Sequence, residues 1–431
     1  MHVTLDNAFA FSILILILIT IMSYIIPSAH VSFTTIKEHQ LEEVAQSIMD
    51  KILLSPGIPE NWGDIKIVNS ENDLKVFGLQ KVNGSLYELD VDKILRINSV
   101  NISTSVTRWY KSGKNWNSVI VKINRTVTLP ETIRISPDKI AELLGLGKDY
   151  GFSIRITPAL NISVYYNSYY DFSNGHGEGQ GWLKAPNPII VTVKTPEGRP
   201  ALGANVTGLF MMMSIVKEKG EEEYNISYTY LTSITDWEGK AILDFKNFLD
   251  DINTKLKNKV LKNSGYSIVV YADYYGIRAV NSSLLETDLD EVLNGMVVDN
   301  YLILEHGLEK HAAAHLGESA GLANPPYYIY LSYFENVTEH GESGWIINHG
   351  NYRIRVYELA NVVDDDVSLI LVSAKYTGKY RLFSFFREPS NVICQKGVAS
   401  GNIKTSVLRR MVRVGSFHYI VEVRVWRWGE G

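Results

Sequence analysis

The chain of 431 residues contains a single cysteine, Cys394. One thiol excludes an intrachain disulfide framework and any zinc site that is built from several cysteines. A glycine-rich phosphate-binding loop is also missing. Charged residues make up 21% and apolar residues 45% of the chain, which excludes both a disordered polyelectrolyte and a polytopic membrane protein. The chain must therefore be stabilised by packing, and its length predicts about two to four domains.

One long apolar run is present, at residues 8–26, with the sequence AFAFSILILILITIMSYII and no charged residue. At about 1.5 Å per residue, a helix of this length spans about 28 Å, which matches the hydrocarbon core of a bilayer. We interpret the run as a single transmembrane helix. A secretory signal peptide is the alternative, but the run lacks a basic segment before it and a small-x-small cleavage pattern before Pro27.

Eight candidate glycosylation sites follow the apolar run. Asn-x-Ser/Thr triplets accept glycans only outside the cytoplasm, although chance alone supplies several in a chain rich in these residues. We therefore expect a single-pass cell-membrane protein whose C-terminal part is extracellular. The candidate acceptors are Asn83, Asn101, Asn124, Asn161, Asn205, Asn225, Asn281 and Asn336.

An amphipathic helix is expected directly after the apolar run. The apolar residues Leu41, Val44, Ile48 and Ile52 recur there at helical spacing, and acidic residues lie between them. The breaker cluster Ser55-Pro56-Gly57 should end this helix. We assign residues 1–57 to the transmembrane helix and its amphipathic extension.

Strand-like runs rich in β-branched and aromatic residues extend over about residues 61–182. One short helix, SPDKIAELLGLG, should interrupt them, with Ser136 as its N-cap and Gly145 or Gly147 at its end. We assign residues 58–183 to an α+β domain.

The rest of the chain predicts two further β-rich units. In residues 186–286, strand pairs joined by tight glycine turns predict a β-sandwich. One crossing helix is expected in it, defined by Leu249, Ile252, Leu256 and Val260 and closed by Gly265. Residues 287–431 should form a β-rich C-terminal domain that ends in an alternating strand with Tyr419, Val421, Val423 and Val425 on one face. The expected fold class is a mainly β multidomain protein on an N-terminal transmembrane helix.

Several phrases of the sequence resemble known families. AQSIMDKILLSPGIPENWG, FGL, YELDVDKI and FSIRITPALNISV, all within about residues 1–165, resemble archaeal type IV pilin-like surface proteins. GRPALGANV and TDWEGKAILDF are similar to Ig-like or carboxypeptidase-regulatory-like modules of extracellular proteins. The first resemblance implies a membrane-anchored α+β neck, and the second implies a structural or binding spacer.

One motif is typical of an enzyme. Residues 317–321 read GESAG, the pattern that presents a nucleophilic serine in α/β-hydrolases, and Asp365 and His418 follow Ser319 in the matching chain order. The residues before the motif are helix formers instead of a β-branched strand, and Asn324-Pro325-Pro326 follows too soon for a helix. An anchored extracellular serine hydrolase is therefore an alternative to a protein without enzymatic activity.

Two sets of histidines could ligate a metal. His311 and His315 are four residues apart, which places both imidazoles on one face of a helix. Two similar loops, SYYDFSNGHGE and SYFENVTEHGE, contribute His176, Glu178, His340 and Glu342. Exposed histidines and solvated loop tips are the simpler interpretation of both sets, so we expect no cofactor, and a metal-binding surface protein remains an alternative.

Charge is distributed unevenly along the chain. Residues 374–431 contain 11 Lys and Arg against 3 Glu, although the whole chain has a formal charge of −5. Such a basic pole can attract acidic partners, and the 25 tyrosines can stack on sugars or on another protein. Our leading hypothesis is a pilin-like cell-surface protein without enzymatic activity, for adhesion or surface assembly. Its expected partners are the membrane, other copies, other surface proteins and glycans, and no specific nucleic acid.

Overall fold

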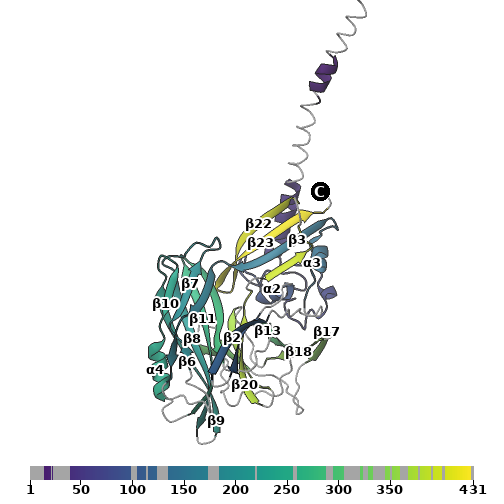
Figure 1. The fold of residues 1–431 in the computed structure, drawn as a ribbon. Helices are drawn as coiled ribbons and strands as arrows, with labels where there is room; N and C mark the ends of the chain where they lie inside the picture. Colours follow the sequence, from purple (N-terminus) through teal and green to yellow (C-terminus); the bar gives the residue numbers. More distant parts are fainter. Residues whose placement is uncertain are drawn as a thin grey trace, which may run out of the picture.

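The computed structural model describes residues 14–20, 22, 39–98, 104–112, 115–123, 134–172, 184–218, 221–255, 260–287, 295–304, 321–323, 329–332, 345–349, 352–359, 367–376, 379–389, 392–399 and 403–428. Within these residues the chain is mainly β, and the expected β-rich fold class is confirmed at this level. A helix enters one end of a head that is made of several sheets (Figure 1).

The amphipathic helix expected after the apolar run is present over residues 39–54. Its inner face is buried in the head through Ala45, Ile48, Met49, Ile52 and Leu53. Upstream of it, residues 14–20 and 22 are helical. None of the helices in the described part of the chain combines the length and the apolar character needed to span a bilayer.

Residues 61–98 differ from the strand-like organisation that we expected. They form turns, the short 3-10 helix η1 (Glu71–Asp73) and the α-helix α2 (Val91–Ile97). The side chain of Asp90 accepts hydrogen bonds from the backbone N–H groups of Asp92 and Lys93 and so caps α2. This cap and the helical spacing of the apolar residues outweigh the β propensity of the valine and isoleucines in α2.

The one helix that we expected between residues 61 and 182 is confirmed as α3 (Pro137–Leu144). The Ser136 side chain accepts a hydrogen bond from the Lys139 backbone N–H at 3.2 Å. Gly145 follows the helix with φ 77°, the left-handed conformation that glycine adopts without steric cost.

A four-stranded antiparallel sheet brings distant segments of the chain together (Figure 1). Its strand order is β21 (Val392–Lys396), β3 (Tyr150–Pro158), β23 (Phe417–Arg427) and β22 (Thr405–Val414). The alternation expected for the last strand is confirmed, because the buried face of β23 contains Tyr419, Val421, Val423 and Val425. This face packs in the same core as the helix of residues 39–54.

A β-sandwich forms the second part of the head. One sheet has the order β10 (Lys240–Leu243), β7 (Ile189–Lys194) and β4 (Asn161–Tyr166). The other has the order β12 (Ile277–Thr287), β11 (Val260–Tyr274), β8 (Asn205–Glu218) and β9 (Glu221–Ile234). The two sheets and helix α4 (Lys246–Lys255) enclose one hydrophobic cluster, so the sandwich with one helix is present.

The helix of the sandwich is shorter than we expected. Leu249 and Ile252 are buried in α4, but Val260 and Gly265 belong to β11, where they pair with Lys217 and Met213 of β8. The prediction that Gly265 closes the helix is therefore wrong. Antiparallel pairing with the long strand β8 outweighs the apolar helical spacing of this segment.

The remaining strands form smaller sheets. Two hairpins pair β1 (Thr104–Ser112) with β2 (Asn115–Ile123) and β5 (Tyr169–Asp171) with β6 (Lys184–Pro186). One sheet has the order β13 (Gly295–Val298), β14 (Tyr301–Leu304), β18 (Tyr352–Glu358) and β17 (Trp345–His349). Another has the order β15 (Gly321–Ala323), β16 (Ile329–Ser332), β19 (Ser368–Tyr376) and β20 (Lys379–Arg387), with β16 parallel to β19.

The expected boundaries between segments do not coincide with the boundaries of the sheets. The sandwich, expected over residues 186–286, includes β4 from the preceding segment. The segments 58–183 and 287–431 likewise share a sheet, because β3 lies between β21 and β23. Strands that are remote in sequence are thus neighbours in the structure.

Gly78 lies where two backbones approach closely. A Cβ added there would lie 2.1 Å from the carbonyl oxygen of Ser55, at the end of the helix of residues 39–54. We expect Gly78→Ala to lower the free energy of unfolding by about 2 kcal/mol or more, since the backbone must shift. Gly147→Ala is the control, because its Cβ would have no neighbour within 4 Å. Urea unfolding of the two variants measures the difference, and equal stabilities would contradict the close approach.

Candidate functional site at the junction of helix and head

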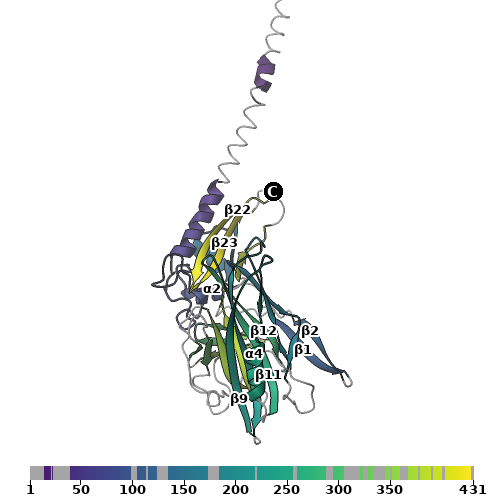
Figure 2. The same ribbon diagram turned by 90° about the vertical axis from the view of Figure 1, so that its left-hand side faces the viewer.

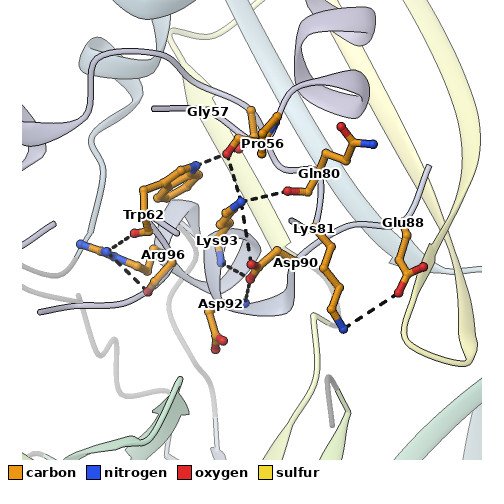
Figure 3. A network of polar contacts seen from close by, with 12 residues as sticks. Pro56, Gly57, Trp62, Gln80, Lys81, Glu88, Asp90, Asp92, Lys93 and Arg96 are labelled. Carbon is orange, nitrogen blue, oxygen red and sulfur yellow. Dashed lines mark hydrogen bonds and ion pairs between the residues drawn. The ribbon is translucent and has the colours of Figure 1, made fainter. Parts of the chain in front are cut away.

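A buried lysine connects α2 to the loops at the end of the N-terminal helix (Figure 3). Lys93 is 0% exposed, and its Nζ donates hydrogen bonds to the carbonyl oxygens of Pro56 at 3.0 Å and Gln80 at 2.9 Å. The Oδ2 atom of Asp90 lies 3.8 Å from the same ammonium. Burial lowers the pKa of Lys93, and the nearby Asp90 opposes this shift. One side chain therefore joins the segment after the helix to the head.

A buried arginine holds the neighbouring turns. Arg96 is 0% exposed, and its guanidinium donates to the carbonyl oxygens of Trp62, of Asp64 at 3.2 Å and of Val68 at 2.5 Å. Burial lowers the pKa of Arg96 to about 10, so the group stays protonated at neutral pH. The fork of N–H donors fixes residues 62–68, which have no regular strand of their own to order them.

Asp92 links α2 to two elements from the later part of the chain. Its Oδ1 atom accepts a hydrogen bond from the backbone N–H of Asp299 at 2.6 Å, in the turn between β13 and β14. Its Oδ2 atom forms an ion pair with Arg387 at the end of β20. We call the set Asp90, Asp92, Lys93, Arg96, Asp299 and Arg387 the junction network.

Asp299 is the strained member of the junction network. Its φ is 50°, in the left-handed region. Burial and the negative charges of Asp92 and Asp64 raise the pKa of Asp299 to about 6. The carboxyl group therefore ionises close to neutral pH, beside another carboxylate.

The junction network joins segments of the chain that are far apart in sequence. Its two fully buried cations, Lys93 and Arg96, donate mainly to backbone carbonyl oxygens, which are not reactive groups. The described residues contain no group of three His, Cys, Asp or Glu side chains that could hold a metal ion. Lys93 contacts the segment that follows the helix of residues 39–54, and Asp92 on the same α2 contacts β20 and the turn between β13 and β14.

His418 has a structural contact that differs from the one expected of a catalytic base. Its Nδ1 atom accepts a hydrogen bond from the Arg278 backbone N–H at 3.1 Å, at the start of β12. Burial lowers the pKa of His418, and the positive charges of Arg413 and Arg278 contribute to the shift. A neutral imidazole that accepts at Nδ1 has its proton on Nε2, whereas the base of a serine hydrolase needs Nε2 as an acceptor.

The other candidate catalytic and metal-binding residues lie outside the described residues. They are Ser319, Asp365, His311, His315, His176, Glu178, His340 and Glu342.

Three of the glycosylation candidates are exposed, namely Asn83, Asn161 and Asn205. The side chain of Asn281 is half-buried and donates a hydrogen bond to the Ile162 carbonyl oxygen at 2.7 Å. Asn225 lies in β9, and the remaining acceptors, Asn101, Asn124 and Asn336, lie outside the described residues.

The basic pole forms part of the exposed face of the sheet that contains β22 and β23. Arg409 and Arg424 both contact Glu422, each at 2.6 Å. Arg413 contacts Glu88 at 2.7 Å. Although burial raises the pKa of Glu88, hydrogen bonds from Arg413 and Ser85 lower it to about 2. The arginines thus outnumber the carboxylates that they contact.

Sequence reasoning missed the junction network. The phrase VDKILRI contains Lys93 and Arg96 between apolar residues on all sides of a helix, and this pattern is the signal that could have indicated buried cations. No family model and no curated protein matches the sequence of this chain.

Removal of the buried ammonium should destabilise the head. We expect Lys93→Met to lower the free energy of unfolding by about 3 kcal/mol, since two buried carbonyl oxygens and Asp90 lose their partner. Lys246→Met removes an exposed i,i+4 pair with Asp250 and should cost less than about 1 kcal/mol. Guanidinium unfolding compares the two variants, and a Lys93→Met protein as stable as the control would refute the role of Lys93.

Asp299 should make stability depend on pH. Its pKa is raised from 3.8 to about 6 in the folded state. The stability contributed by the protonated form is therefore complete below about pH 4 and is lost as the pH rises through about 6. Asp299→Asn, which keeps the backbone N–H and tolerates the left-handed conformation, should remove this loss. In urea unfolding between pH 4 and 7, the free energy of unfolding of the variant should increase relative to that of the wild type as the pH rises. Parallel pH profiles of the two proteins would contradict the assignment.

Proposed function

We propose that the chain is a membrane-anchored cell-surface protein without enzymatic activity, pilin-like in organisation, for adhesion or surface assembly. The observation that carries the proposal is an apolar helical segment whose side chains are exposed all round. Residues 14–20 are helical, and Leu14, Leu16 and Ile19 are 54%, 68% and 63% exposed. A helix that is apolar on every side needs a bilayer or a bundle of like helices around it.

A second observation that supports the proposal is the junction network, which connects the helix of residues 39–54 to the head. A surface protein that bears load between its anchor and its head needs a stiff connection between them. The helix of residues 39–54 buries one face in the core through Ala45, Ile48 and Ile52, and Lys93 fixes the loop that follows the helix. The exposed acceptors Asn83, Asn161 and Asn205 are compatible with an extracellular head.

The test of the anchor uses charged substitutions in full-length protein in cells. We expect Leu16→Arg/Ile19→Arg to release the protein from carbonate-washed membranes, since each arginine costs about 2.5 to 3.5 kcal/mol at the centre of a membrane helix. Leu54→Arg is the control, because Leu54 is 45% exposed at the head end of the helix and should leave membrane binding unchanged. Protease added to intact cells should remove the head of the wild type.

Two outcomes would contradict the proposal. A double-arginine variant that stays in the membrane as firmly as the wild type would exclude residues 8–26 as the anchor. A head that resists protease on intact cells but is cut after lysis would place it on the cytoplasmic side.

A further inference from the structure

The strand β22 has an open edge. It is the last strand in the order β21, β3, β23, β22, and β23 is its only partner strand in the described part of the chain. Near its end, the Arg413 N–H donates to the Tyr87 carbonyl oxygen at 2.9 Å, and the Arg413 carbonyl oxygen accepts from the Leu89 N–H at 2.8 Å. Arg413 thus directs its backbone groups away from β23.

The orientation of the backbone groups of Arg413 determines the orientation of the backbone groups in the rest of β22. In an antiparallel ladder the residues alternate between bonding to the partner strand and pointing away from it. The residues at positions 405, 407, 409 and 411 therefore point their N–H and C=O groups to the open edge. Their side chains are exposed, with Val407 at 45% and Met411 at 48%.

An open edge of this kind can pair with another strand, and the charge along the edge limits which strands can pair with it. Arg409, Arg410 and Arg413 follow one another closely along β22. Two copies of β22 placed edge to edge would bring these like charges together, which is unfavourable. An acid-rich strand is the complementary partner.

The chain itself contains such a strand. β9 begins with Glu221, Glu222 and Glu223, and it is the last strand of its own sheet, in the order β12, β11, β8, β9. Figures 1 and 2 both show β22 at the end of the head where the helix enters, and β9 extending to the opposite end. One copy therefore presents a basic edge at one end and an acid-rich edge strand at the other.

We propose that the open edge of β22 pairs with the acid-rich beginning of β9 in a second copy, so that copies join head to tail. The two surfaces in this contact differ from each other. A contact between unlike surfaces can repeat from copy to copy and form an open filament, unless the rotation between copies closes them into a ring. The inference deepens the proposed surface assembly, but it does not need the membrane anchor. It can therefore fail or hold independently of the anchor experiment.

The test uses the full-length protein in detergent, followed by sedimentation velocity. Val407→Pro removes an N–H that faces the open edge and leaves the β22–β23 bonds in place, so we expect the dissociation constant for self-association to rise at least about tenfold. Val407→Thr keeps the N–H and serves as its control. Glu221→Lys/Glu222→Lys/Glu223→Lys should abolish self-association, whereas the same charge change at Glu197, Glu238 and Asp251 should not.

A mixing experiment distinguishes this contact from other forms of self-association. The Val407→Pro protein still offers its β9, and the triple-lysine protein still offers its β22. At a concentration near the dissociation constant of the wild type, each variant should be mostly monomeric alone. An equal mixture should form one-to-one dimers that dissociate when salt rises from about 0.05 to 0.5 M. Circular dichroism checks that both variants remain folded.

Three results would overturn the proposal. The first is a wild type that stays monomeric at every concentration. The second is a triple-lysine variant that self-associates like the wild type, which would indicate that β22 pairs with another surface. The third is an equal loss of self-association in the Val407→Thr and Val407→Pro proteins, which would assign the effect to the side chain of residue 407 instead of the backbone of the strand edge.

Discussion

The position of the head relative to its helix depends on two buried cations. Lys93 and Arg96 are both fully buried, and they are hydrogen-bonded to carbonyl oxygens of the segment between residues 56 and 80. That segment has few regular elements, and the carbonyl oxygens of Pro56, Trp62, Val68 and Gln80 accept their hydrogen bonds from these two side chains. Asp92 then extends the same network to β20 and to the turn before β14. The order of an irregular region thus rests on a helix of two turns.

Local signals in the sequence predicted local elements. The helix of residues 39–54 follows from apolar spacing, and α3 follows from a serine cap, an initial proline and a terminal glycine. The alternation in β23 was equally readable, because Val421, Val423 and Val425 on one face are all buried, whereas Arg424 on the other face is exposed. In each case the information lies within about a dozen neighbouring residues.

The errors arose where distant contacts decide the structure. Val260 and Gly265 have helical spacing with α4, yet pairing with β8 makes them a strand. β3 gives no sign in its own sequence that its neighbours are β21 and β23. The same holds for the junction network: the apolar neighbours of Lys93 and Arg96 indicate burial, but the carbonyl oxygens that the two cations bind belong to other segments, which the sequence does not identify.

The shared sheet also has a consequence for the time course of folding. During synthesis, β3 is complete long before either of its neighbours exists, because β3 ends at Pro158 whereas β21 begins only at Val392 and β23 at Phe417. Its apolar residues Phe152, Ile154 and Ile156 would meanwhile lie beside two open edges. Pairing over such a sequence distance is slow, and this sheet can close only once β21 and β23 have been synthesised. The nascent chain therefore carries β3 with two unpaired edges until β21 has been synthesised.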